Sequence, residues 1–184
     1  MMGLPDAEAA IGVTRRWLER FVIGQRLCPF AAAPYHANRI AYRVSEACTL
    51  DGVFHDFLVT LEECVASDPR EQETALLILT RALGVFDDYL DALDLMERAV
   101  NEAGLDGRLQ LASFHPDYRF EGAAADDPAN FSNRSPLPMF HLIREDGLAA
   151  ALETYPEPAR IPARNIRHLR RLGLDRVRAL LSGD

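Results

Sequence analysis

Residues 75–80 read ALLILT, a short and continuous run of apolar residues. A strand with one face in water alternates apolar and polar residues, whereas an unbroken apolar run of this length is typical of a strand buried on both faces. Such strands occur in sheets that helices cover on both sides. Residues 75–80 therefore predict a buried strand in an α/β fold.

Hydrophobic periodicity predicts the other elements, because helices repeat at 3.6 residues and half-buried strands at two. The strand at 38–45 alternates, with Ile40, Tyr42 and Val44 on one face. The remaining predictions are helices at 6–23, 49–67 and 86–104, strands at 108–115 and 138–144, a helix from 146 to about 154, and two short helices divided at Gly173.

Strands and helices alternate along this chain, as in βαβ units, which favours parallel pairing with right-handed crossovers. The chain has 184 residues, a usual length for one domain. We predict a single α/β domain over residues 1–184, with about four strands that are mostly parallel and helices packed on the sheet. A long ordered loop joins the last two strands.

Charge and cysteine content restrict the class of protein. The net charge of −8 opposes binding to a phosphate backbone, so nucleic acid is not expected as a partner. Residues 160–184 hold seven arginines against two acids, which leaves open an interaction surface there. The sequence contains no apolar run of ~18 residues, which is the length that a membrane span requires, so no span is predicted. An odd number of cysteines, three, and the lack of a signal-peptide pattern indicate a cytoplasmic protein.

The segment 116–137 reads PDYRFEGAAADDPANFSNRSPL and has no period. Connections of this length without secondary structure are uncommon in compact domains and are usually functional or disordered. Tyr118, Phe120 and Phe131 offer apolar anchors, which favours order. Ligands of open α/β sheets bind at the carboxyl ends of strands, so we expect a pocket formed by the end of strand 108–115, this loop and the strand at 138–144.

One hypothesis for this pocket is a metal site. His115, Asp117 and His141 have the residue types of a two-histidine, one-carboxylate site for a divalent metal such as Fe, Zn or Mn. If strand 138–144 runs antiparallel to strand 108–115, His141 lies roughly 7 Å from His115 along the strand, and if it runs parallel, roughly 10 Å. The order of elements favours the parallel arrangement, which counts against the triad.

A second hypothesis is acid–base or nucleophilic catalysis. His115 could act as a base, with His141 as an acid, or either histidine could activate Cys28, with Asp117 orienting the imidazole. A cysteine near a helix C-terminus gains nothing from the helix dipole, so Cys28 could equally be a small buried residue at a turn. The histidine, proline and aspartate at 115–117 could likewise form a capped turn, with the Asp117 side chain bonding nearby backbone amides.

Donors in and after the loop suit a small polar or anionic molecule. The candidate substrate-binding residues are Asn133, Arg134, Ser135, Arg144 and Glu145. These observations favour an enzyme acting on such a molecule. The alternatives are an anion-binding module without chemistry, an interaction protein that uses its arginine-rich C-terminal helices, and arginines that merely pin the loop to nearby acids. The oligomeric state is left open.

Three motifs carry a resemblance to a known family. They are LCPFA at 27–31, ASFHPDYRFEG at 112–122 and NRSPLPMFHLIRE at 133–145. The chain resembles the bacterial family catalogued as domain of unknown function 1415, and the residues of IPARNI at 161–166 also fit. The resemblance covers nearly the whole chain. It implies no activity, because that family has none assigned.

Overall fold

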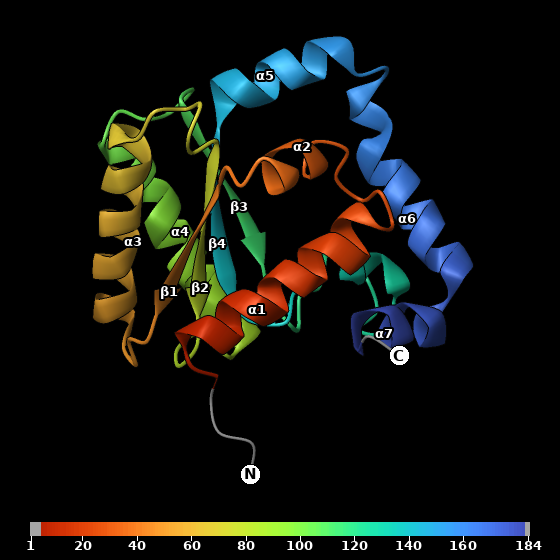
Figure 1. The fold of residues 1–184 in the computed structure, drawn as a ribbon. Coiled ribbons are helices and arrows are strands. Elements are labelled where there is room, and N and C mark those ends of the chain that lie inside the picture. The colour runs from red at the N-terminus through yellow and green to blue at the C-terminus, as the bar shows by residue number, and fades with distance from the viewer. Residues whose placement is uncertain (1–4, 183–184) are drawn as a thin grey trace.

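The apolar run at 75–80 lies in β2 (Thr74–Leu79), and all six residues of this strand are buried. The computed structural model describes residues 5–182, in which β2 belongs to a four-stranded sheet of order β1-β2-β4-β3. Helices cover both faces of the sheet (Figure 1). The prediction of an α/β fold with four strands and helices packed on the sheet is therefore confirmed.

Most of the predicted elements form within one or two residues of their expected ends, and α2, η2 and η3 were not predicted. The elements are α1 (Ala7–Trp17), the π-helical segment η1 (Leu18–Ile23), α2 (Ala32–His36), β1 (Ile40–Ser45), α3 (Leu50–Ala66), α4 (Phe86–Glu102), β3 (Leu109–Phe114), the 3-10 helix η2 (Pro128–Ser132), β4 (Met139–Arg144), α5 (Glu145–Thr154), the 3-10 helix η3 (Pro158–Arg160), α6 (Ile161–Leu172) and α7 (Leu174–Ser182).

Local chemistry explains where several helices begin and end. Asp6 caps α1 by accepting a hydrogen bond from the Ala9 amide at 2.8 Å, and Thr49 caps α3 in the same way. Gly173 separates α6 from α7 with a φ of +79°, a backbone conformation that other residues rarely adopt. The helical pattern at 160–184 therefore breaks at this glycine, and residues 183–184 lie outside the described part of the chain.

The prediction of a mostly parallel sheet is wrong. Only β1 and β2 pair in parallel, whereas β4 is antiparallel to both β2 and β3. Strands β1, β2 and β3 do run in one direction, as βαβ units require, but β4 lies between β2 and β3. The loop at 115–138 contains only one short helix, so it does not return the chain to the other end of the sheet, and β4 starts where β3 ends.

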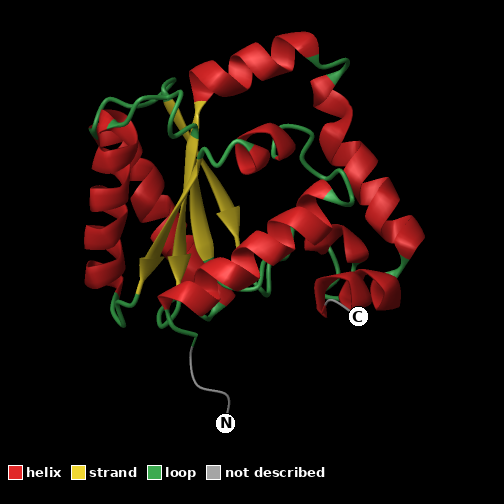
Figure 2. Cartoon of the chain, viewed as in Figure 1, coloured by secondary structure: helices red, strands yellow, loops and turns green. Residues whose placement is uncertain are grey.

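The two faces of the sheet bury separate apolar cores, between the helix layers seen in Figure 2. On one face α3 and α4 pack on Leu77, Leu79 and Phe140, and the predicted core residue Cys64 is fully buried there. On the other face α1, η1, α6 and α7 form a core that includes Leu76. No helix within residues 5–182 is long and apolar enough to cross a membrane.

Candidate functional site

His115 directly follows β3 and is fully buried on the α4 side of the sheet. Its ring centroid lies 5.3 Å from that of Phe86 and 5.1 Å from that of Tyr89. Nε2 donates a hydrogen bond to the Leu83 carbonyl at 3.0 Å, and Nδ1 accepts one from the Asp117 amide at 3.0 Å. Burial lowers the pKa of His115, which favours the neutral ring. Because both ring nitrogens are engaged, no lone pair remains for a metal or a proton.

Three other predicted site residues stabilise the loop or face solvent. Asn133 Nδ2 donates to the Ser113 carbonyl at 3.1 Å. The buried Ser135 hydroxyl donates to the Leu137 carbonyl at 2.6 Å. The side chain of Asp117 is exposed, and only its backbone amide contacts His115. Hydrogen bonds of this kind fix turns, but the group that accepts at 115–117 is the His115 ring and not the Asp117 side chain of the capped-turn alternative.

The Arg134 side chain stabilises the loop by hydrogen bonds to carbonyls of the loop itself. Its Nε donates to the Tyr118 carbonyl at 3.0 Å and its Nη2 to the Ala125 carbonyl at 2.7 Å. The guanidinium lies over the Phe131 ring, 4.5 Å from the centroid. The Arg134 carbonyl in turn accepts a hydrogen bond from the Trp17 indole at 3.0 Å. Most of the donors predicted to hold a substrate anion therefore bind the protein's own carbonyls.

Arg144 has a similar structural role at the end of β4. Its Nε donates to the Gln72 carbonyl at 3.1 Å, and its Nη2 donates to the Ser67 carbonyl at 2.8 Å. The same Nη2 also contacts the Cys64 carbonyl. These bonds tie the C-terminal end of α3 to the sheet. Glu145 begins α5, and its backbone amide donates to the Arg108 carbonyl at 3.0 Å.

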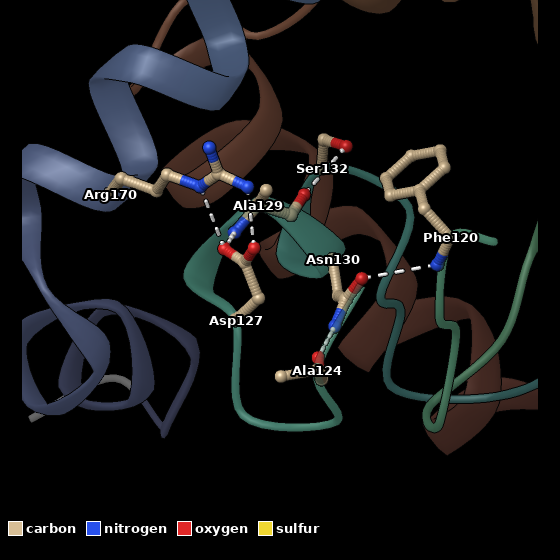
Figure 3. A network of polar contacts seen from close by, with 7 residues as sticks. All are labelled: Phe120, Ala124, Asp127, Ala129, Asn130, Ser132 and Arg170. Carbon is tan, nitrogen blue, oxygen red and sulfur yellow. Dashed lines mark hydrogen bonds and ion pairs between the residues drawn. The ribbon is translucent and has the colours of Figure 1, made fainter. Parts of the chain in front are cut away.

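A buried amide, that of Asn130, and the carboxylate of Asp127 order the middle of the loop (Figure 3). The Asn130 side chain, fully buried, accepts from the Phe120 amide at 3.1 Å and donates to the Ala124 carbonyl at 2.8 Å. Asp127 accepts two hydrogen bonds from the Arg170 guanidinium of α6, at 3.1 and 2.6 Å. The Arg170 guanidinium holds the pKa of Asp127 below its usual range. The loop is thus ordered, as predicted, and anchored to the arginine-rich C-terminal segment.

The structure does not bring the three predicted metal ligands together. His141 pairs in register with Leu76 and Ala112 and shares their face of the sheet, which is the α1 side. His115 lies on the α4 side, with the sheet between the two imidazoles. Within residues 5–182 there is no group of three His, Cys, Asp or Glu side chains that could hold a metal ion. The antiparallel direction of β4 does not bring the three ligands together, because His115 and His141 lie on opposite faces of the sheet.

His141 instead lines a cavity of about 500 Å³, here called the apolar cavity. It lies between the sheet and the helical segments α1, η1, α2 and α5, and its volume is typical of small-molecule sites. Most of its lining is aliphatic or aromatic. The polar side chains that line it are Cys28, Glu73, Thr74, His141, Arg144 and Tyr155.

The tautomer of His141 follows from its hydrogen bonds. Its Nε2 lies 2.5 Å from the Thr74 hydroxyl, whose oxygen lies 2.6 Å from the Leu142 carbonyl. The single hydrogen of the Thr74 hydroxyl goes to this carbonyl, so Nε2 must donate to Thr74. Nδ1 then carries a lone pair. No hydrogen bond joins Nδ1 to any described residue, and the residue lines the apolar cavity.

Burial sets the protonation of both reactive groups in the apolar cavity. It lowers the pKa of His141 to about 4, so the imidazole is neutral near pH 7. The ring keeps some accessible surface because it lines the cavity, but protein surrounds it. Burial also raises the pKa of the Cys28 thiol, against smaller lowering effects of the Phe30 and Ala31 amides. The apolar cavity thus holds a neutral base and a neutral thiol.

Cys28 lies a few residues beyond the end of η1, before the turn that leads into α2. The backbone of this turn lowers the pKa of the thiol, but burial outweighs it and the pKa is raised, in line with a cysteine that gains nothing from the helix dipole. The neighbouring π-helical segment contributes Leu18 and Val22 to the apolar cavity. Short π-helical segments occur frequently at functional sites, which fits a ligand site here.

Sequence patterns did not predict Thr74 and Trp17 as site residues. Thr74 is the polar residue that starts the apolar run of β2, and its hydroxyl sets the tautomer of His141. A hydroxyl residue directly before an apolar run is the one sequence signal that could have indicated Thr74. Trp17 looks like any core residue of an amphipathic helix, so nothing in the sequence distinguished it.

By fold, this chain is a mixed α/β protein whose four-stranded, mostly antiparallel sheet carries an apolar cavity on one face. Residues 9–179 match the model of the family described as protein of unknown function (DUF1415), so the chain belongs to that family, as its motifs indicated. No curated protein and no solved structure matches the chain.

Proposed function

We propose that this protein is a small-molecule binding module whose ligand occupies the apolar cavity and donates a hydrogen bond to Nδ1 of His141. The observation that carries the proposal is the unpaired Nδ1 in a mostly apolar enclosure. Small-molecule sites combine an apolar lining with a few placed polar groups that fix orientation. A ligand with an apolar body and one hydroxyl or amide donor satisfies both features.

Binding is favoured over acid–base chemistry because of the protonation of His141. With its pKa lowered to about 4, the imidazole is a weak base and a good neutral acceptor. The pKa of Cys28 is raised, so transfer of the thiol proton to His141 is strongly uphill. An anionic ligand is also less suitable in the apolar cavity, because burying an unpaired charge is costly.

A second candidate is an enzyme in which Cys28 acts as a nucleophile on the bound molecule. It is favoured by the placement of Cys28 and His141 on one cavity and by the backbone of Phe30 and Ala31, which lowers the pKa of the Cys28 thiol against the larger effect of burial. Thiol reactivity tests it, with the exposed Cys48 as an internal reference. A nucleophilic Cys28 reacts with iodoacetamide near neutral pH faster than Cys48, whereas slower alkylation rules this candidate out.

Calorimetric titration of 4-propylphenol and propylbenzene tests the binding function, because the two probes differ in a single donor. We expect the phenol to bind about ten-fold more tightly, as one buried hydrogen bond implies. His141→Phe should remove this preference, and Ala112→Leu, which fills the floor of the apolar cavity, should weaken both probes. His55→Ala, on the exposed face of α3, is the matched control.

The fluorescence of Trp17, the one tryptophan in the chain, gives a second readout because its side chain lines the apolar cavity. Equal affinity for the two probes in the wild-type protein, or a preference that survives His141→Phe, would refute the proposed role of Nδ1. Affinity for both probes that Ala112→Leu leaves unchanged would place the ligand elsewhere.

A further inference from the structure

A second cavity, of about 330 Å³, is lined by residues at the end of the sheet. This is the end at which α5 follows β4 (Figure 1). Arginines from four separate segments line it, and we refer to it as the arginine pocket. Arg39 precedes β1, Arg108 precedes β3, Arg144 ends β4 and Arg70 lies in the connection before β2. The pairing of the strands brings these segments to one end of the sheet, because β1 and β3 begin at the end where β4 stops.

The four guanidinium groups differ in how fully they are engaged. Arg70 is paired with Asp68, at 2.7 Å, and its side chain is 89% exposed. Arg144 donates to backbone carbonyls through two of its nitrogens. Arg39 contacts Glu73 at 3.0 Å through Nη2, but its Nε is buried without a hydrogen-bond partner among the described residues. The protein therefore leaves part of the hydrogen-bonding capacity of Arg39 unused.

Arg108 has the most available guanidinium. Its side chain is exposed and forms no hydrogen bond or ion pair with any residue from 5 to 182. Its backbone is fixed, because its carbonyl accepts a hydrogen bond from the Glu145 amide at 3.0 Å. This bond holds Arg108 beside the first turn of α5. A fixed backbone with a free planar guanidinium suits recognition of an oxyanion.

The charge of the arginine pocket is opposite to that of the whole chain. Four arginines line it against two acids, Glu73 and Asp146, in a protein of net charge −8. A local positive field in a concave site concentrates anions. Gly147 also lines the pocket, in the first turn of α5, whose N-terminus has no capping side chain. Apart from the Glu145 amide, which donates to Arg108, the first-turn amides of α5 have no capping side chain, and they add to the attraction for an anion.

We infer that the arginine pocket binds an anion with a phosphate or carboxylate group, which Arg108 and Arg39 hold. This site is independent of the ligand proposed for the apolar cavity. The two sites adjoin, since Glu73, Arg144 and Gly147 line both of them. No predicted site residue other than Arg144 and Glu145 lies in this part of the chain.

Titration of the whole protein with inorganic phosphate, followed by NMR of backbone amides, tests the inference. Sodium chloride at equal ionic strength is the blank, because it screens charge without offering an oxyanion. We expect saturable shifts at residues 108 and 145–148, with a Kd of ~10 mM or tighter. Arg108→Gln should weaken binding by about five-fold or more, as loss of a charge-assisted pair implies. Acetate in place of phosphate distinguishes a carboxylate site from a phosphate site.

Arg98→Gln is the matched control, because Arg98 is an exposed arginine on α4 outside both cavities. The inference is overturned if neither anion gives saturable shifts, or if Arg98→Gln and Arg108→Gln weaken binding equally. Ala112→Leu separates the two sites, since it fills the apolar cavity alone. Phosphate affinity that falls in Ala112→Leu but not in Arg108→Gln would also overturn it.

Discussion

His115 and His141 lie on opposite faces of the sheet, although only the loop and the start of β4 separate them in the sequence. His115 packs on Tyr89 of α4, and both of its ring nitrogens are engaged by backbone groups. His141 lies on the α1 side and lines the apolar cavity, and its Nδ1 has no hydrogen bond to any described residue. One histidine therefore stabilises the loop, and the other is available to a ligand.

We expect His115→Phe to lower the free energy of unfolding by roughly 2–4 kcal/mol, because it leaves the Leu83 carbonyl and the Asp117 amide without partners. The phenyl ring keeps the aromatic contacts, so packing alone would predict little loss. Urea unfolding measures the change, with exposed His55→Ala as the control. A loss within the error of the control would mean that the two hydrogen bonds do not stabilise the loop.

Stability should fall below about pH 6.5 because of His141. Its native pKa is lowered to about 4 by burial, so between these values the unfolded chain binds a proton that the native protein does not. The stabilisation is complete above the pKa that His141 has in the unfolded chain, and it is lost as the pH falls toward the pKa of His141 in the native protein. This group accounts for roughly 3 kcal/mol over that range, and His115, whose pKa is also lowered, acts in the same direction.

Unfolding free energies measured from about pH 7 down to about pH 4.5 test this linkage. His141→Phe should show a clearly weaker pH dependence than the wild-type protein, whereas His55→Ala should keep the full dependence. Carboxylates such as Asp127, with a lowered pKa, act mainly at more acidic pH. Identical pH dependence in the wild type and His141→Phe would show that His141 titrates normally.

Asp127 has two separable roles, as the cap of η2 and as the partner of Arg170. Its carboxylate accepts from the Ala129 amide at 2.9 Å as well as from the guanidinium. Asp127→Ala should cost about 1 kcal/mol or more, since it removes a helix cap. Arg170→Gln should cost less, because an exposed ion pair contributes little. Equal losses in thermal or urea unfolding would assign the stabilisation to the ion pair instead.

Two glycines of the N-terminal helical segment should respond oppositely to alanine. A Cβ at Gly24 would lie 2.2 Å from the Arg20 carbonyl oxygen, so Gly24→Ala should strain the end of η1 and cost roughly 1–3 kcal/mol. At Gly12, within α1, the nearest atom is the flexible Arg16 guanidinium at 3.5 Å. Gly12→Ala should stabilise by roughly 0.5–1 kcal/mol. A stable Gly24→Ala would show that the π-helical turn is not required.

The fold uses some of the predicted site residues to hold the backbone and leaves others available to a ligand. The sequence drew attention to the loop, and the structure uses Asn133, Arg134 and Ser135 there to hold the backbone. His141 and Cys28 remain available because they line a cavity, which no local pattern reports. A side chain that binds the protein's own carbonyls and one that faces a ligand look the same in a sequence.

Apolar periodicity was enough to predict most helices and strands, because each depends on residues close together in the chain. The run at β2, the stripes of α3 and α4 and the break at Gly173 all follow from such local patterns. The tertiary structure alone decided the place and direction of β4. Its insertion between β2 and β3 depends on pairings between distant segments, and that register decides which face of the sheet each histidine occupies.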